Sequence, residues 1–204
     1  MKYSIIAACT VALLASACSS GPSNVKKLVI MSSGKLTAKG QDSKEITFEP
    51  GTQHNELDLQ YVGSDPVKIT VKSKDGDKTY DLTESGSYLL NLKSADTLIG
   101  SIVKYGEGGI PTSITTEQLQ HIVDSTQQLI MGLNASDEAK TYFIVPGAVK
   151  KVSANYTAKL IGPFNGIPNT VEAGKDGKAP EIYKFTTSKQ KREELYDLVK
   201  RMNK

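Results

Sequence analysis

The chain has 204 residues, with 25 basic and 22 acidic side chains and a formal net charge of +3. This near balance argues against a nucleic-acid-binding protein, because such proteins carry a clustered excess of Lys and Arg. The length is sufficient for one compact domain or two small ones. Trp is absent and only four residues are Phe, a composition typical of a hydrophilic protein rich in strands.

The first residues have the pattern of an export signal. Lys2 provides a positive start, residues 5–14 form an apolar run, and residues 15–17 are the small residues Ala-Ser-Ala. A signal peptidase cleaves after small residues of this kind, so we expect residues 1–17 to be a signal peptide. The apolar run is shorter than the ~20 residues that span a bilayer as a helix.

Residues 14–18 (Leu-Ala-Ser-Ala-Cys) resemble the lipobox of bacterial lipoproteins, with Ala15 at a place where that family favours Leu. The resemblance implies that the Cys18 thiol carries a diacylglycerol, which anchors the chain in a membrane. It further implies the outer membrane, with the body facing the periplasm, because Ser19 stands where inner-membrane retention needs Asp. The alternative is an ordinary signal cut before an incidental cysteine. Cys9 lies within the signal, so Cys18 is the only cysteine expected in the mature chain.

Residues 18–24 are polar and predict a flexible linker after the lipidated cysteine. Residues 25–105 contain short apolar or alternating segments separated by turn residues, including a turn expected at Pro50-Gly51. This spacing predicts seven or eight strands in an antiparallel β-sandwich or partly open barrel. The predicted strands are centred on residues 28–31, 46–48, 57–61, 67–71, 79–82, 88–92 and 98–105.

Residues 106–114 are rich in Gly and predict a linker to a smaller α+β segment, residues 115–204. The spacing of apolar residues in that segment predicts a helix at 115–133 and a C-terminal helix at 188–202. The whole chain is therefore expected to be mainly β with two helices, an α+β fold. The strands expected in the second segment are residues 142–145, 149–161 and 182–185.

Both helices have N-terminal capping patterns. Thr115 is followed by Gln118, and Thr187 by Gln190, so each pair has the spacing of a capping box. The first helix also carries a wide apolar stripe, which favours packing against the sheet of the same chain, with a partner-binding surface as the alternative. The stripe consists of Leu119, Ile122, Val123, Thr126, Leu129, Ile130 and Leu133.

The long connection at residues 162–180 is unusual, because structureless connections above ~12 to 15 residues are uncommon within a compact domain. It carries Phe164, Ile167 and Val171 among several Gly and Pro residues. Apolar side chains on a loop of this kind are candidates for contact with a partner protein. The alternative is that these three side chains fold back and cover the core.

The sequence contains no recognisable catalytic motif. His54 and His121 are the only histidines, and neither lies in a pattern with a nucleophile and an orienting acid. His54, Glu56 and Asp58 could be metal ligands on one strand face, but the same alternation is typical of a solvated sheet face, which we favour. We therefore predict no catalytic, cofactor-binding or metal site.

These features together predict a non-enzymatic lipoprotein of the outer membrane that binds another envelope protein as an accessory or assembly component. Two alternatives remain open from the sequence. One is a carrier or sensor that holds a small glycan or lipid between sheet and helix. The other is a cell-wall hydrolase, which would need His54 or His121 beside a Ser or a carboxylate in a cleft of the folded chain.

Overall fold

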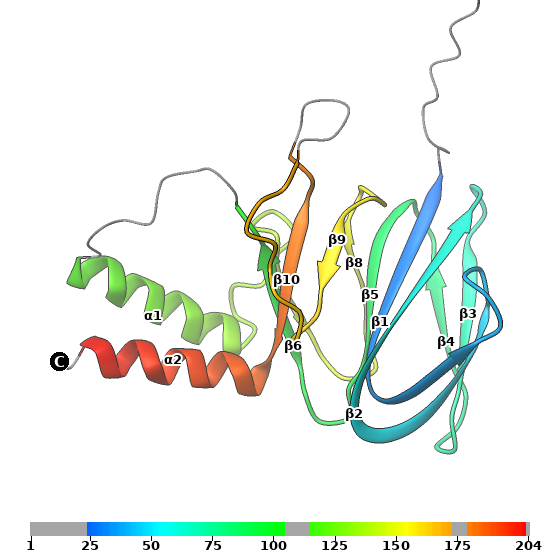
Figure 1. Ribbon diagram of the computed structural model, residues 1–204, viewed down its shortest axis with the longest axis horizontal. Helices are drawn as coiled ribbons and strands as arrows, with labels where there is room; N and C mark the ends of the chain where they lie inside the picture. Colours follow the sequence, from blue (N-terminus) through cyan, green and yellow to red (C-terminus); the bar gives the residue numbers. More distant parts are fainter. Residues whose placement is uncertain (1–23, 105–114, 173–178, 203–204) are drawn as a thin grey trace, which may run out of the picture.

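The computed structural model describes residues 24–104, 115–172 and 179–202. Within these ranges the chain forms a six-stranded sheet, called sheet A, a four-stranded sheet, called sheet B, and two helices (Figure 1). The predicted fold, mainly β with two helices and built as a sandwich or partly open barrel, is confirmed. The predicted signal peptide, Cys18 and the predicted linker at 106–114 lie outside the described residues.

Sheet A curls into a nearly closed, barrel-like form, and sheet B packs beside it (Figure 1). The strand order in sheet A is β4 (Lys78–Leu82), β3 (Val67–Lys72), β2 (Glu45–Val62), β1 (Val25–Ala38), β5 (Gly86–Leu92) and β8 (Val149–Ser153). The order in sheet B is β7 (Thr141–Ile144), β6 (Leu98–Ile102), β10 (Ile182–Thr187) and β9 (Lys159–Ile161). The helices are α1 (Thr116–Ile130) and α2 (Ser188–Met202).

Strands β1 and β5 are parallel neighbours at the centre of the molecule, and both of their faces are buried. Leu28 and Ile30 of β1 point into the core inside sheet A, whereas Val29 and Met31 point into the core between the sheets. All seven residues of β5 are buried. A strand covered on both faces needs a continuous apolar run, which explains the sequence Leu-Val-Ile-Met at 28–31.

Both sheets combine strands from the two sides of residues 106–114. β8 pairs antiparallel with β5 in sheet A, and β6 pairs antiparallel with both β10 and β7 in sheet B. Three of the described pairings are parallel, namely β1 with β5, β2 with β3, and β9 with β10. The turn pattern of the sequence did not indicate these parallel pairings.

The strand expected to end at Pro50-Gly51 continues, so that prediction of a turn is wrong. β2 runs through both residues and bends where the register of β1 shifts between Ser33 and Gly34. A Cβ atom on Gly34 would lie 2.1 Å from the carbonyl oxygen of Glu49, so only glycine fits this close backbone approach. An irregularity in strand pairing also accommodates Pro50, which has no N–H to donate.

The single strand expected at 149–161 is two strands in different sheets. β8 ends at Ser153 in sheet A, and β9 begins at Lys159 in sheet B. The intervening turn is stabilised by Asn155, whose side-chain oxygen accepts hydrogen bonds from the N–H and the hydroxyl of Thr157. Asn side chains often form such local bonds, which compete with continued strand pairing.

The helices α1 and α2 lie side by side and extend away from sheet B (Figure 1). Both predicted capping boxes are present, formed by Thr115 with Gln118 and by Thr187 with Gln190. The prediction that the apolar stripe packs on the sheet is wrong, because α1 packs mainly on α2 and only Val123 of α1 is buried. Neither helix, over its described residues, has the length and apolar character required to cross a bilayer.

The contact between β6 and β10 provides a stability test. Gly100 of β6 lies under the buried ring of Phe185, and a Cβ atom at that position would be 2.3 Å from the ring. We expect Gly100→Ala to lower the free energy of unfolding by about 1 to 3 kcal/mol, because the added methyl overpacks this core. Urea denaturation measures the loss. The control Gly166→Ala, where a Cβ meets nothing within 4 Å, should leave stability nearly unchanged.

Candidate functional site

The loop that follows β9 carries the three residues predicted to bind a partner, and Phe164 is the most exposed of them. Phe164 is 64% exposed and Ile167 is 42% exposed. Val171 is partly buried, and the residues after Glu172 up to 178 lie outside the described part of the chain. Phe164 and Ile167 therefore face outward and do not cover the core, whereas Val171 is intermediate.

The backbone of this loop is held by side chains from β10 and α2. The ammonium group of Lys184 donates hydrogen bonds to the carbonyl oxygens of Gly162 and Asn165, each at 2.6 Å. The side-chain amide of Gln190 donates to the carbonyl oxygen of Pro163 at 3.3 Å. Because backbone atoms on both sides of Phe164 are bonded, the position of this side chain is set by the folded body.

A second group of contacts comes from β2 and from the end of β5. Glu56 accepts hydrogen bonds from the Asn165 amide at 3.0 Å and from the His54 ring at 2.7 Å. The His54 ring meets the Phe164 ring edge-on, with 4.9 Å between centroids. The Lys93 ammonium lies 5.6 Å from the centroid of the Phe164 ring, which is within the range of a cation–π interaction.

The ammonium groups of Lys93 and Lys184, which contact the Phe164 loop, are partly desolvated. Burial lowers the pKa of both Lys93 and Lys184, while the nearby Glu56 carboxylate acts in the opposite direction. Lys93 is only 3% exposed, so its cation finds stabilisation from Phe164, Glu56 and Asp96 in place of solvent. The Phe164 ring thus contacts an imidazole and an ammonium group, and most of its surface remains exposed.

The residues that support the loop share no pattern in the sequence. His54 and Glu56 are recognisable as alternating polar residues of one strand, but Lys93 and Lys184 carry no motif that identifies them. They lie far from Phe164 in the chain and reach it only through the pairing of the sheets. The solvated-face interpretation of residues 54–58 is therefore incomplete, because His54 and Glu56 lie under the loop.

The remaining candidates for a metal or catalytic site are dispersed. Asp58 pairs with Lys27 at 3.3 Å, so it does not join His54 and Glu56. His121 is exposed on α1. Over the described ranges the structure contains no group of three or more His, Cys, Asp or Glu side chains that could hold a metal ion.

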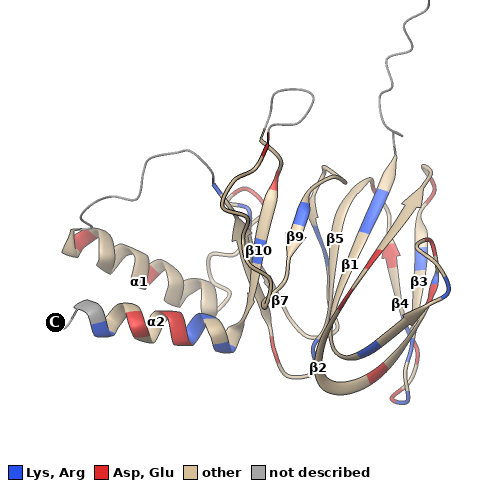
Figure 2. Cartoon of the chain, viewed as in Figure 1, with Lys and Arg blue, Asp and Glu red and all other residues tan. Residues whose placement is uncertain are grey.

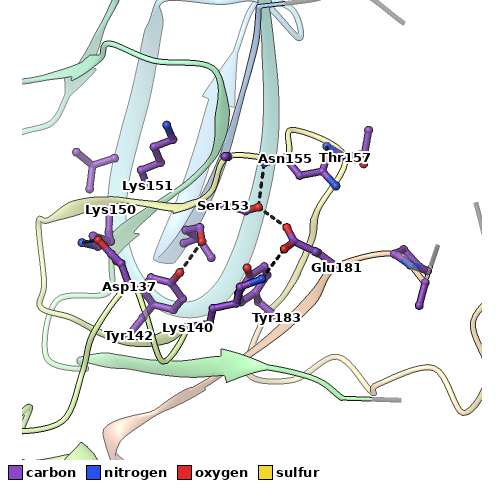
Figure 3. Close-up of a pocket in the computed structure, with 15 residues that line it drawn as sticks. Asp137, Lys140, Tyr142, Lys150, Lys151, Ser153, Asn155, Thr157, Glu181 and Tyr183 are labelled. Carbon is purple, nitrogen blue, oxygen red and sulfur yellow. Dashed lines mark hydrogen bonds and ion pairs between the residues drawn. The ribbon is translucent and has the colours of Figure 1, made fainter. Parts of the chain in front are cut away.

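A groove of about 840 Å³ lies along β8 and forms a second candidate site (Figure 3). One wall is the continuous run of residues 149–155. The other walls come from the segment before and within β7 and from the start of β10. The first of these walls contributes Asp137, Lys140 and Tyr142, the residues before and within β10 contribute Ala179, Pro180, Glu181 and Tyr183, and Thr157 lines the groove from the turn after β8.

Glu181 is the centre of a polar network in this groove. Its carboxylate accepts a hydrogen bond from the Lys140 ammonium at 2.7 Å and another from the Ser153 hydroxyl (Figure 3). Burial acts to raise the pKa of Glu181, but the bonds from Lys140 and Ser153 outweigh it and leave the pKa below its ordinary value. The bond to Glu181 in turn raises the pKa of Lys140. The network joins Ser153 of β8 to the residues that directly precede β10 and β7 of sheet B.

Two tyrosines close the base of the groove. Tyr142 and Tyr183 pack edge-on with 5.8 Å between ring centroids, and both belong to the core between the sheets. The Tyr142 hydroxyl donates a hydrogen bond of 2.5 Å to the carbonyl oxygen of Val152. Burial raises the pKa of both tyrosines, so their hydroxyl groups stay protonated at neutral pH and remain donors.

Comparison of the chain with protein-family models, with curated proteins and with solved structures finds no significant match. The function of this chain is therefore inferred from the geometry of its two candidate sites.

The Glu181 network predicts a pH-dependent contribution to stability. We expect Glu181→Gln to lower the free energy of unfolding at pH 7 by about 1 kcal/mol, since hydrogen bonds to charged groups contribute ~1.5 to 3 kcal/mol and solvent screens this pair. A carboxylate with a lowered pKa stabilises the fold above its ordinary pKa of 4.5, and this contribution is lost as the pH falls through the folded-state value.

Urea denaturation of both proteins from about pH 3 to about pH 8, a range that includes the titration of carboxylates, measures this difference. The two stability curves should run parallel at neutral pH and converge at the acidic end. A difference that persists unchanged at the acidic end would contradict the assigned role of the charge.

Proposed function

We propose that this chain is a lipid-anchored lipoprotein of the outer membrane, facing the periplasm, that binds another envelope protein through the loop carrying Phe164 and Ile167. It acts as an accessory or assembly component and performs no catalysis itself. The observation that carries the proposal is the combination of an exposed Phe164 side chain with a loop backbone that is hydrogen-bonded on both sides of it.

This combination is favourable for binding for an energetic reason. Ordering a loop or side chain during association costs about 0.5 to 1.5 kcal/mol for each immobilised side chain. Lys184 already fixes the backbone around Phe164, and His54 and Lys93 already contact its ring. A partner that buries the exposed part of the ring therefore gains apolar contact with little further ordering, as expected for an aromatic anchor of an interface.

The position in the envelope is proposed from the resemblance of residues 14–18 to a lipobox. If Cys18 carries the lipid, the linker up to Asn24 is short, and β1 begins at Val25. An extended chain of this length spans at most ~3.3 to 3.6 Å per residue, so the body would stay close to the membrane surface. The partner is accordingly another protein at that surface.

The two alternative functions receive less support. A carrier that holds a glycan or lipid between sheet and helix needs a cavity there, but α1 and α2 pack mainly on each other. For a hydrolase, His54 does lie beside the Glu56 carboxylate, but its side chain is only 17% exposed and its ring packs edge-on against Phe164, which leaves little access for a substrate. We therefore retain the binding protein as the proposal.

Crosslinking of the full-length protein in cells tests the binding surface. We expect the double variant Phe164→Ala/Ile167→Ala to lose most of the crosslinked partner, because aromatic anchors contribute about 2 kcal/mol or more to an interface. The matched control is Tyr196→Ala on α2, which removes an aromatic side chain that is 69% exposed. Recovery of the same partner at the same yield from the double variant would show that the loop is not the interface.

The anchor is tested separately through Cys18→Ser. We expect the wild-type protein to fractionate with membranes and its mature N-terminus to carry the mass of the acyl chains. The variant should be released in soluble form, since two or more acyl chains are needed for stable anchoring. A wild-type N-terminus without lipid would refute the anchor and leave the Phe164 interface to be judged by the crosslinking alone.

A further inference from the structure

The groove along β8 has the shape of a site for an extended chain. β8 is the last strand of sheet A, with β5 on one side and the groove along the other. Every residue from Val149 to Asn155 lines the groove, and the part of this run that is strand, Val149–Ser153, corresponds to about 16 Å at 3.3 Å per residue. We propose that this groove binds an extended acidic segment of a partner polypeptide, which adds to β8 as a further strand of sheet A.

The backbone of β8 points its outer polar groups at the groove. In an edge strand, alternate residues direct their N–H and C=O groups away from the paired neighbour. The carbonyl of Val152, the extra residue where the register with β5 shifts, already accepts the hydroxyl of Tyr142, so it is not among the groups offered to a partner. An incoming strand can pair with the outer groups of this edge, as in other complexes formed by strand addition.

The charges around the groove favour an acidic segment. Three lysines line it, Lys140, Lys150 and Lys151, against the two acids Asp137 and Glu181. Lys150 and Lys151 stand next to each other within β8 itself. Because successive side chains of a strand point to opposite faces, an acidic side chain of an incoming strand would pair with Lys151 on one face or with Lys150 on the other, and a lysine side chain would be repelled on either face.

An acidic segment could replace the present partners of Lys150 and Lys151 at a small cost in free energy. Lys150 pairs with Asp137 at 2.9 Å, and Lys151 pairs with Glu84 at 2.5 Å. The Glu84 side chain is 72% exposed and that of Asp137 is 62% exposed. Exposed ion pairs of this kind contribute only about 0 to 1 kcal/mol, so an acidic segment can replace either acid without a large penalty.

The same lysines exclude a second copy of this chain as the occupant. If β8 of another copy paired antiparallel about Lys151, the middle residue of the strand, the two Lys151 side chains would lie directly opposite each other. Like charges placed directly across a pair of strands are destabilising. Lysines on an edge strand are also a common means of preventing indiscriminate strand pairing. Pairing of β8 with a second copy of β8 is thus disfavoured, and pairing with a strand of opposite charge is favoured.

This site is independent of the Phe164 loop. Phe164 is held by residues of β2 and β10 and by Lys93 beyond β5, and none of its described contacts lines the groove. A failure of the Phe164 interface would therefore leave the groove unaffected. The groove would likewise remain testable if the chain proved to carry no lipid.

The test uses the full-length protein and three labelled, end-blocked nonapeptides. In the first, Glu alternates with Val and Thr; in the second, Lys replaces Glu; in the third, Pro replaces every Val and Thr while Glu is kept. Fluorescence anisotropy measures affinity, and hydrogen exchange of backbone amides locates the bound peptide. We expect the Glu peptide to bind at least about tenfold more tightly than the Lys peptide, equivalent to about 1.4 kcal/mol.

Variants of the protein separate a specific site from general charge attraction. Lys150→Glu/Lys151→Glu should reverse the preference toward the Lys peptide, and Lys150→Gln/Lys151→Gln should abolish it. Lys68→Glu, a reversal at an exposed lysine of β3, is the matched control and should retain the wild-type preference. Phe164→Ala should also bind the Glu peptide normally. Exchange should slow at residues 149–155 when the Glu peptide is bound.

Several results would overturn the proposal. Equal affinity for the Glu and Lys peptides would remove the charge argument. Equal affinity for the Glu peptide and its Pro-containing form would indicate an anion site, because Pro cannot donate backbone hydrogen bonds. Slowed hydrogen exchange centred on residues 162–168 would place the peptide at the Phe164 loop and not in the groove. Absence of binding of the Glu peptide at about 1 mM, equivalent to about −4 kcal/mol, would also exclude it.

Discussion

The burial of the parallel pair β1 and β5 on both faces is the constraint on which the rest of this structure depends. Each fully buried Leu, Ile or Val side chain contributes about 1.5 to 3 kcal/mol, and these two strands supply such side chains to two cores at once. One core is enclosed by the curl of sheet A, and the other requires a second sheet. Sheet B has to cover β1 and β5, and its position determines which loops and edges remain exposed.

The two candidate sites are consequences of this arrangement at different places along the sandwich. Where β9 leaves sheet B, the chain passes over β2 and β10, and the polar residues of these strands hold the Phe164 loop. At β8, sheet A ends in an edge strand, and the groove lies beside it. Both sites combine exposed recognition groups with a rigid support, which is the arrangement expected for sites that bind partners. Ion pairs within the chain engage Lys140, Lys150 and Lys151 at the groove, and Figure 2 shows basic and acidic residues interspersed along the strands and α2.

The candidate sites were predictable in part. The composition of residues 162–180 was sufficient to single out Phe164 and Ile167, because apolar side chains among Gly and Pro in a long connection are unusual. The supporting cation at Lys93 and the anchor at Lys184 were not predictable, because lysines are numerous and none has a local signature. The groove was also missed, since the expected strand at 149–161 concealed both the edge strand and the turn that comes after it.

The sequence by itself determined the local features of this protein: the alternation of strands, both helices and their caps, the mainly β fold class and the apolar loop. These features depend on the conformational preferences and spacing of residues close together in the chain. Only the tertiary structure decided which strands pair in parallel, that β8 and β9 belong to different sheets, and that α1 packs on α2. Those outcomes depend on contacts between residues that are distant in the sequence. The free energy of these contacts comes from burying the two cores together, so no short segment of the sequence indicates them.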